Sequence, residues 1–256
     1  MSSFCMRKLD IFIYLCSMKT TDIILGQINI IPEGVVFDYS ELGIPAEMQL
    51  AAAKALSRMV AEKKLKKVGK GKFYKPVYSR LGAMTPLVDE LTKDLLYKNG
   101  KVIGYVTGVP IFAQMGLTTQ ISSKILIGSN TYRRPLVRGG YEISFTRQDN
   151  KISEDNIPLL RFLDAIRFVK RIPACTPDNA LKILMERISS LDNGKIDALI
   201  QLSYSYPASA RALFGAILEN KGLDALMLKK SLNPLTKYNI GISDYILPNK
   251  SNWNII

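Results

Sequence analysis

The sequence contains no histidine, and this absence removes several kinds of chemistry at once. Ser-His-Asp and Cys-His mechanisms need an imidazole base, and many metal sites use histidine ligands. Cysteine is also scarce, because Cys5, Cys16 and Cys175 are far apart and form no CxxC pair. Such cysteine usage argues against a disulfide framework or a thiolate zinc site and favours a reducing compartment, so we expect a cytoplasmic protein.

Long apolar runs are missing as well. Residues 9–16 (LDIFIYLC) are mostly apolar but are eight in number, whereas a membrane-spanning helix needs about 20. Residues 17–19 offer no small-x-small cleavage site, and Met18 opens a segment that resembles an ordinary protein start. We therefore expect residues 1–17 to be an extension, either disordered, an added strand or an upstream-start artefact, and we expect no membrane association.

Positive charge is abundant and concentrated. The 256-residue chain has a formal net charge of +13, and the window from Lys54 to Arg80 contains ten Lys or Arg residues and a single acid, Glu62. A basic cluster on one short segment is typical of a nucleic-acid-binding surface. The alternative is a solvated basic face that maintains solubility.

The residues around this window predict a winged helix-turn-helix. Apolar spacing indicates a helix over 21–30, followed by a short strand at 35–37. Asp38 or Ser40 then caps a brief helix through Leu42, and a third helix covers about Ala46 to Lys63, after Pro45. A basic β-hairpin follows, with its turn at 69–71 (Gly-Lys-Gly).

The third helix should be two-sided. At about 100° per residue, one side faces the core and the other faces solvent. The expected core side comprises Met48, Ala52, Ala55, Leu56 and Met59. The expected outer side comprises Gln49, Ala53, Lys54, Ser57 and Arg58. Leu50 also falls outward, where its role is either contact with a methyl group or dimer packing.

A second domain is expected after a linker at about 76–86. The pattern predicts strands near 105–107, 124–128, 133–138 and 141–147, and helices at 86–97, 109–116, 158–171, 177–191, 195–204 and 207–220. The tail beyond Leu232 is expected to be extended, with Trp253 as its anchor. The sequence thus predicts an α+β protein, in which the winged helix-turn-helix precedes a mixed α/β domain with a helical C-terminal part.

Motifs for catalysis are incomplete. Gly128-Ser129 resembles the opening of nucleotidyltransferase sites, but the following strand supplies one carboxylate, Glu142, where a two-metal site needs two. Residues 69–72 (GKGK) have the wrong spacing for a phosphate-binding Walker A loop. We therefore expect no catalytic residue, no metal site, no cofactor and no enzymatic activity.

A second basic group lies further along the chain. It comprises Arg133, Arg134, Arg138 and Arg147. These arginines could extend a DNA contact, bind RNA, or face solvent.

Two stretches give the chain a family resemblance. Residues 54–60 (KALSRMV) and 65–74 (LKKVGKGKFY) resemble the recognition helix and wing of AbiE-type antitoxins, an AbiEi-like type IV toxin–antitoxin family. Residues 107–120, which include AQMGLTTQ, and the region 124–145 continue the likeness, which covers about residues 20–200. The wing has lysine where that family often has arginine, and the tail after Leu232 has no counterpart.

The resemblance implies an antitoxin that represses its own promoter at inverted repeats. Its functional partner would be a nucleotidyltransferase-like toxin, neutralised without a stable complex, and a homodimer on DNA is possible. Two alternatives remain open: a nucleic-acid-targeted enzyme with a winged targeting module, and a protein-interaction module. The expected domains are an extension at 1–17, a DNA-binding domain at 18–78 and an antitoxin-like domain at 79–256.

Specific residues are expected to touch DNA. In the helix they read bases or hold phosphates, and in the hairpin they hold the flanking backbone. The expected DNA-binding residues are Gln49, Lys54, Ser57, Arg58, Lys66, Lys67, Lys70 and Lys72.

Overall fold

The structure, a computed structural model, describes residues 20–80 and 82–256. The expectations for residues 1–17, including Cys5 and Cys16, lie outside the described residues. The chain forms two compact units, which we describe separately. The first comprises the described residues up to Lys93 together with Val137–Gly139, and the second comprises Asp94–Leu136 and Gly140–Ile256.

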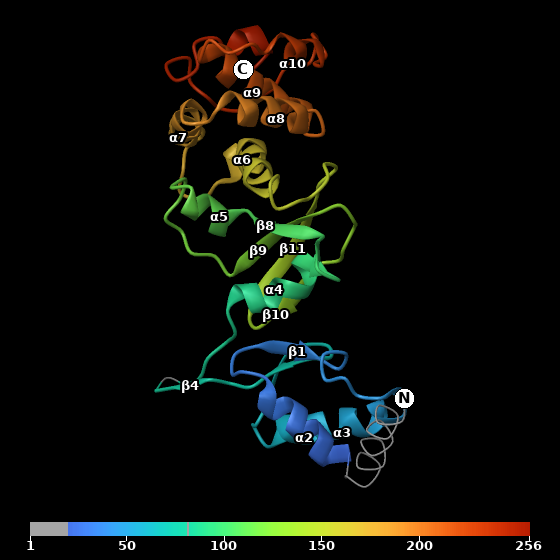
Figure 1. Cartoon of the computed structure of the whole chain (residues 1–256). Coiled ribbons are helices and arrows are strands. Elements are labelled where there is room, and N and C mark those ends of the chain that lie inside the picture. Colours follow the sequence, from blue (N-terminus) through green and yellow to red (C-terminus); the bar gives the residue numbers. More distant parts are fainter. Residues whose placement is uncertain (1–19, 81) are drawn as a thin grey trace, which may run out of the picture. The chain divides into compact units, whose positions relative to one another are not determined.

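The first unit is a small winged arrangement (Figure 1). Its elements in chain order are α2 (Thr20–Ile30), β1 (Val36–Asp38), the 3-10 helix η1 (Ala46–Met48), α3 (Gln49–Ala61), β2 (Lys66–Gly69), β3 (Lys72–Tyr74), β4 (Tyr78–Ser79) and β5 (Gly82–Ala83). The three longer strands form an antiparallel sheet in the order β1-β3-β2, and α2 packs against α3. Phe37, Leu56 and Phe73 are almost fully buried in the shared core.

Two expectations for this unit need correction. The brief helix through Leu42 is wrong, because Tyr39–Gly43 form a turn. Asp38 does cap, but it caps a turn: its carboxylate accepts hydrogen bonds from the backbone N–H and hydroxyl of Ser40. The third helix begins as η1 and ends at Ala61, and Lys63 adopts a left-handed conformation with φ of 61°.

The division between the units also differs from the expected boundary near residue 78. It falls inside α4 (Val88–Leu96), between Lys93 and Asp94. The first half of α4 is tied to the winged unit, because the Glu90 carboxylate accepts a hydrogen bond of 3.1 Å from the N–H of Val36. This contact joins residues far apart in the chain, so local sequence patterns could not reveal it.

The second unit contains β11, β9 and β8 of a mixed four-stranded sheet whose order is β10-β11-β9-β8. The strands of this sheet are β8 (Gly104–Thr107), β9 (Lys124–Ser129), β10 (Leu136–Arg138) and β11 (Tyr141–Arg147), and helix α5 (Val109–Gln114) follows β8. Strands β6 (Tyr97–Lys98) and β7 (Lys101–Val102) form a separate two-stranded hairpin. β9 and β11 are parallel, whereas β8 is antiparallel to β9. Strand β10 is shorter than the expected 133–138, and the small hairpin β6–β7 was not expected.

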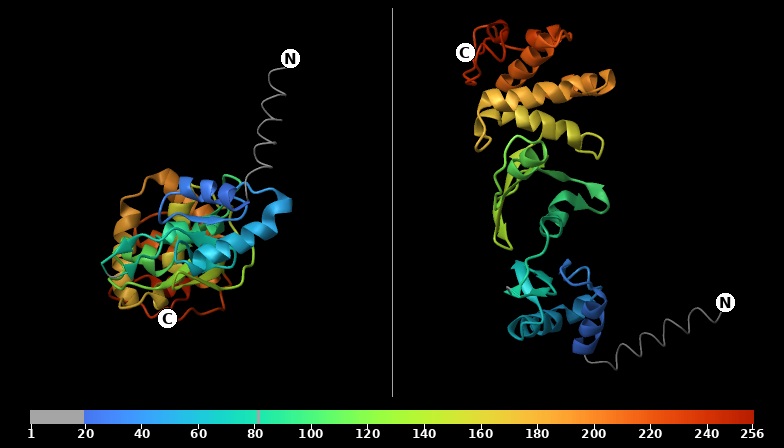
Figure 2. Two further views of the ribbon diagram at one scale, coloured as in Figure 1. Left: turned by 90° about the horizontal axis from the view of Figure 1, so that it is seen from below. Right: turned by 90° about the vertical axis from the view of Figure 1, so that its left-hand side faces the viewer.

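Helices make up the rest of this unit, and Figure 2 shows them stacked in successive layers. They are α6 (Ile157–Arg167), η2 (Val169–Arg171), α7 (Pro177–Ser189), α8 (Asn193–Ser203), α9 (Ala208–Asn220), α10 (Leu226–Lys230) and η3 (Lys250–Trp253). Helix α6 contacts β8 on one side and α8 and α9 on the other. The α+β fold with a helical C-terminal part is therefore as predicted, while α10 and η3 were missed.

The C-terminal tail is anchored by the single tryptophan, as predicted. Trp253 is 2% exposed and packs against Gly215 of α9, where an added Cβ would lie 2.1 Å from the indole ring. The indole N–H donates to the Glu219 carboxylate at 2.9 Å. Glycine at 215 therefore makes room for the ring, and the tail is packed rather than merely extended.

Among residues 20–80 and 82–256, no helix combines the length and apolar character that crossing a membrane requires.

Candidate nucleic-acid interface

Helix α3 has one buried side and one exposed side. Ala52, Ala55, Leu56 and Met59 are buried, as predicted, because their spacing places them on one face of the helix. Met48 is half-buried in η1 instead. Of the side chains predicted to face outward, those at 49, 54, 57 and 58 are exposed, whereas Ala53 is half-buried.

The exposed side of α3 is positive. Its sequence, QLAAAKALSRMVA, contains Lys54 and Arg58 and no acid. Within the described residues, Lys54 has no hydrogen-bond or ion-pair partner. Glu62, the one acid of the basic window, forms an ion pair of 2.8 Å with Lys64. Lys54 is thus left for an external partner, whereas Arg58 is also attracted by the Glu62 carboxylate one turn further along.

The hairpin of β2 and β3 forms the wing and adds further exposed lysines. Its turn contains Gly71 at φ of +70°, a conformation that glycine adopts without strain. The register shifts between Lys67 and Gly69, so one extra residue bulges from β2. Lys66, Lys67 and Lys70 are exposed, and the Lys67 ammonium lies 5.7 Å from the centre of the Phe73 ring.

Lys72 differs from the other predicted DNA-binding lysines. Its side chain is 14% exposed, and its ammonium lies 3.3 Å from the Asp38 carboxylate on the neighbouring strand. Burial by itself would raise the pKa of Asp38, but hydrogen bonds from Ser40 and the Lys72 ammonium outweigh it and lower that pKa. Lys72 therefore pairs β3 with β1, and we assign it to the stability of the wing.

The predicted second basic group is not a single surface. Arg138 is buried and donates to the Leu91 carbonyl at 2.8 Å. Arg133 donates to the Leu95 carbonyl at 3.3 Å and covers the Phe145 ring. Arg147 is exposed, but it is paired with Asp149 at 2.6 Å. These arginines mostly bond to the protein itself, so they carry less free charge than the sequence suggested.

The nucleotidyltransferase-like motif does not assemble a metal site. In the parallel pairing, Ser129 lies opposite Arg147, whereas Glu142 lies opposite Lys124 at the other end of the strands. Five residues of strand separate the two positions, which corresponds to about 16 Å. Glu142 is 3.7 Å from the Lys124 ammonium. In the described part of the chain, no group of three or more acidic or cysteine residues could hold a metal ion.

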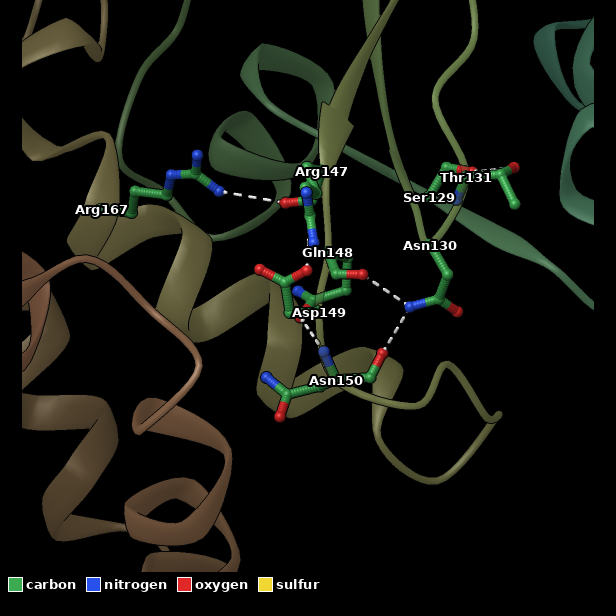
Figure 3. Close-up of polar contacts among 8 residues, drawn as sticks. All are labelled: Ser129, Asn130, Thr131, Arg147, Gln148, Asp149, Asn150 and Arg167. Atoms are coloured by element: carbon green, nitrogen blue, oxygen red, sulfur yellow. Dashed lines mark hydrogen bonds and ion pairs between the residues drawn. The ribbon is translucent and has the colours of Figure 1, made fainter.

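Polar side chains at the carboxyl ends of β9 and β11 donate to backbone carbonyls there (Figure 3). The Asn130 amide donates to the carbonyls of Gln148 and Asn150, at 2.6 and 2.7 Å. Arg167 donates to the Arg147 carbonyl at 3.3 Å. These bonds satisfy backbone carbonyls where the strands end. The donor groups of Asn130 and Arg167 are therefore already engaged within the protein.

The second unit also contains a buried polar network that sequence patterns did not reveal. Asp164 on α6 is fully buried and accepts hydrogen bonds from the hydroxyls of Tyr105, at 2.8 Å, and Tyr206, at 3.1 Å. The Gln148 amide donates to both hydroxyls at 2.9 Å. Burial raises the pKa of the Asp164 carboxyl, and hydrogen bonds from the two tyrosines oppose that rise. The network joins the sheet to α6 and to Tyr206, which precedes α9.

Comparison with known proteins gives a family but no activity. The model of a family of unknown function, DUF6088, matches residues 24–171. A search of curated proteins found no match. A solved structure, the RV2827C protein from Mycobacterium tuberculosis, is similar at 16% identity with a TM-score of 0.45, covering 84% of this chain and 82% of that one. Because the family model spans more than half of the chain, the protein belongs to the DUF6088 family.

Proposed function

We propose that this protein binds duplex DNA through α3 and the β2–β3 wing. The observation that carries the proposal is a helix without acids whose exposed face bears Lys54 and Arg58, followed directly by a wing with Lys66, Lys67 and Lys70 exposed. A helix fits the major groove, which is about 12 Å wide. Cations beside it attract phosphates and displace counterions.

Each exposed side chain has a role that suits its chemistry. Arg58 can donate two hydrogen bonds to the edge of guanine, and Gln49 can pair with adenine. Ser57 can bond to either kind of base or to a phosphate. The wing lysines would hold the flanking backbone and set the position of α3 without reading sequence. Lys72 is not included among these residues because its ammonium forms an ion pair with Asp38.

We further propose that DNA binding serves an antitoxin and autorepressor of a type IV, AbiE-like toxin–antitoxin or phage-defence operon in the cytoplasm. The support is the likeness of residues 54–74 and 107–145 to that family. The operator would be inverted repeats in its own promoter, bound by a homodimer. The second unit would act against a nucleotidyltransferase-like toxin without forming a stable complex with it.

Footprinting on the region upstream of the gene tests this function. We expect protection of an inverted repeat by the full chain, and loss of that protection in Lys54→Ala/Arg58→Ala. Protection that persists in the double variant would place the DNA contact elsewhere. Absence of binding to this region and to other duplex DNA would refute the proposal.

A further inference from the structure

Leu50 is unusually exposed for a leucine on a helix that packs in a core. Its side chain is 75% exposed, whereas Ala52 and Leu56 on the same helix are fully buried. With about 100° per residue, Leu50 points nearly opposite the centre of the buried side. The most outward position of α3 is thus occupied by a branched apolar side chain, whose exposure to water is unfavourable in free energy.

The neighbours of Leu50 indicate what covers it. Lys54 lies one turn further along the same side, and Arg58 lies one turn beyond Lys54, with no acid between them. The nearest acid is in η1, one turn before Leu50. The adjacent Ala51 and Ala53 have small side chains, so Leu50 projects beyond the local surface. An apolar tip next to cations matches one feature of duplex DNA, namely thymine methyl groups that line the major groove between the two rows of phosphates.

A second copy of this chain is a less suitable occupant. A two-fold contact places the same patch of both subunits face to face. Such a contact through Leu50 would bring Lys54 and Arg58 of one copy against the same residues of the other. Like charges repel, and the single carboxylate beside Leu50, that of Glu47 in η1, still leaves each copy with a net positive charge on this face.

We infer that Leu50 is a specificity-determining residue that contacts the C5-methyl group of a thymine in each DNA half-site. The inference rests on the proposed DNA binding, and it adds the kind of base that the helix selects. Leu50 is the second residue of α3, and the N-terminal residues of a recognition helix are those that approach base edges. The operator should therefore contain a thymine whose methyl group matters more than its hydrogen-bonding groups.

The test separates the methyl group from the rest of the base. The full chain is used to select duplexes from a random library, and each thymine of the enriched sequence is then replaced singly by deoxyuridine, which lacks only the C5-methyl. We expect one position per half-site at which this change weakens wild-type binding by about fourfold, the value for burial of one methyl-sized group.

The variant Leu50→Ala completes a double-mutant cycle. It should weaken binding to the thymine duplex by about four- to tenfold, and the deoxyuridine change should then have no further effect. Leu87→Ala is the control, because Leu87 lies in the same unit, is 76% exposed and is not part of α3. The control should bind both duplexes like wild type.

Three outcomes would overturn the inference while leaving DNA binding intact. Wild type could tolerate deoxyuridine at every position, the effects of Leu50→Ala and deoxyuridine could multiply independently, or Leu50→Ala could change the molar mass measured by light scattering, which would make Leu50 a subunit contact. Failure of wild type to enrich any duplex would instead refute the proposed function, and the inference with it.

Discussion

Cations bonded within the second unit contrast with the exposed lysines of the first. In the second unit, guanidinium groups bond to carbonyls of the same unit: Arg161 to Val106 and Arg187 to Met115. In the first unit, Lys54, Lys66 and Lys70 are exposed and have no hydrogen-bond or ion-pair partner within the described residues. The contrast teaches that net charge alone does not locate an interface. Charge that bonds internally stabilises a fold, and charge without a partner is available for binding.

Acidic groups of both units, in contrast, bond within the protein. Asp164 is buried in the second unit within a network of tyrosines and Gln148. In the first unit, Asp38 and Glu62 each pair with a nearby lysine, Lys72 and Lys64. If the units divide their roles in this way, changes in the second unit should alter stability, and changes on the exposed face of α3 and the wing should alter DNA binding.

Trp253→Ala should cause the largest loss of stability. Removing the ring leaves a cavity over Gly215 and deletes the bond to Glu219, so we expect about 3–5 kcal/mol less stability in the second unit. Circular dichroism should monitor unfolding, because Trp253 is the only tryptophan. If the division of roles holds, DNA affinity measured below the new transition stays the same. A large loss of affinity at a temperature where the fold is intact would contradict it.

Arg58→Ala should weaken binding to the cognate operator by about 1–3 kcal/mol, the value of a specific base contact. Its guanidinium is exposed, so stability should hardly change. A gel-shift titration and thermal unfolding together measure both quantities. Unchanged operator affinity would remove Arg58 from the interface.

The Asp164 network should make stability depend on pH. Because burial raises the pKa of Asp164, the folded state binds more protons than the unfolded state between the ordinary carboxyl pKa and the raised one. Stability should therefore fall as pH rises through that window, and Asp164→Asn should flatten the fall. Urea unfolding at several pH values measures this. The control is Asp149→Asn, since Asp149 is half exposed; equal slopes in wild type and Asp164→Asn would contradict the assignment.

Lys70→Ala and Lys72→Ala form a matched pair on one hairpin. Loss of a phosphate contact at Lys70 should lower the salt slope of DNA binding by about one unit without changing stability. Lys72→Ala should leave the slope unchanged and cost up to about 1 kcal/mol of stability, because it breaks the partly buried pair with Asp38. The reverse pattern would show that the wing tip is not at the DNA.

Local periodicity predicted most of the winged unit, although not the turn at 39–43. The spacing of Ala52, Ala55, Leu56 and Met59 gave the buried side of α3, and the glycines at 69 and 71 gave the turn of the wing. The proposed site was likewise visible as outward-facing positions of one helix. What sequence patterns could not give was the partner of Lys72, since Asp38 lies 34 residues earlier and meets it only through strand pairing.

The second unit was less predictable because long-range contacts determine its roles. The strands at 124–128 and 141–147 were expected, but their register was not. The parallel pairing places Ser129 and Glu142 at opposite ends of the strands, so these two residues do not form a shared metal site. Arg138, which the chain returns to the first unit, looked like a surface cation in sequence, but it is buried and donates to the Leu91 carbonyl. A fully buried carboxylate at 164 gave no local signal, because its partners Tyr105, Gln148 and Tyr206 come from three distant segments.

The salt dependence of DNA binding by the full chain tests the central claim most directly. The slope of log K against log salt is about −0.9 for each phosphate neutralised on duplex DNA. Lys54 and the three exposed wing lysines should therefore give a slope of about −3 to −4, and the double variant Lys54→Ala/Lys70→Ala should reduce it by about two units. A slope near zero, or one that the double variant leaves unchanged, would contradict the claim that α3 and the wing form the DNA-binding face.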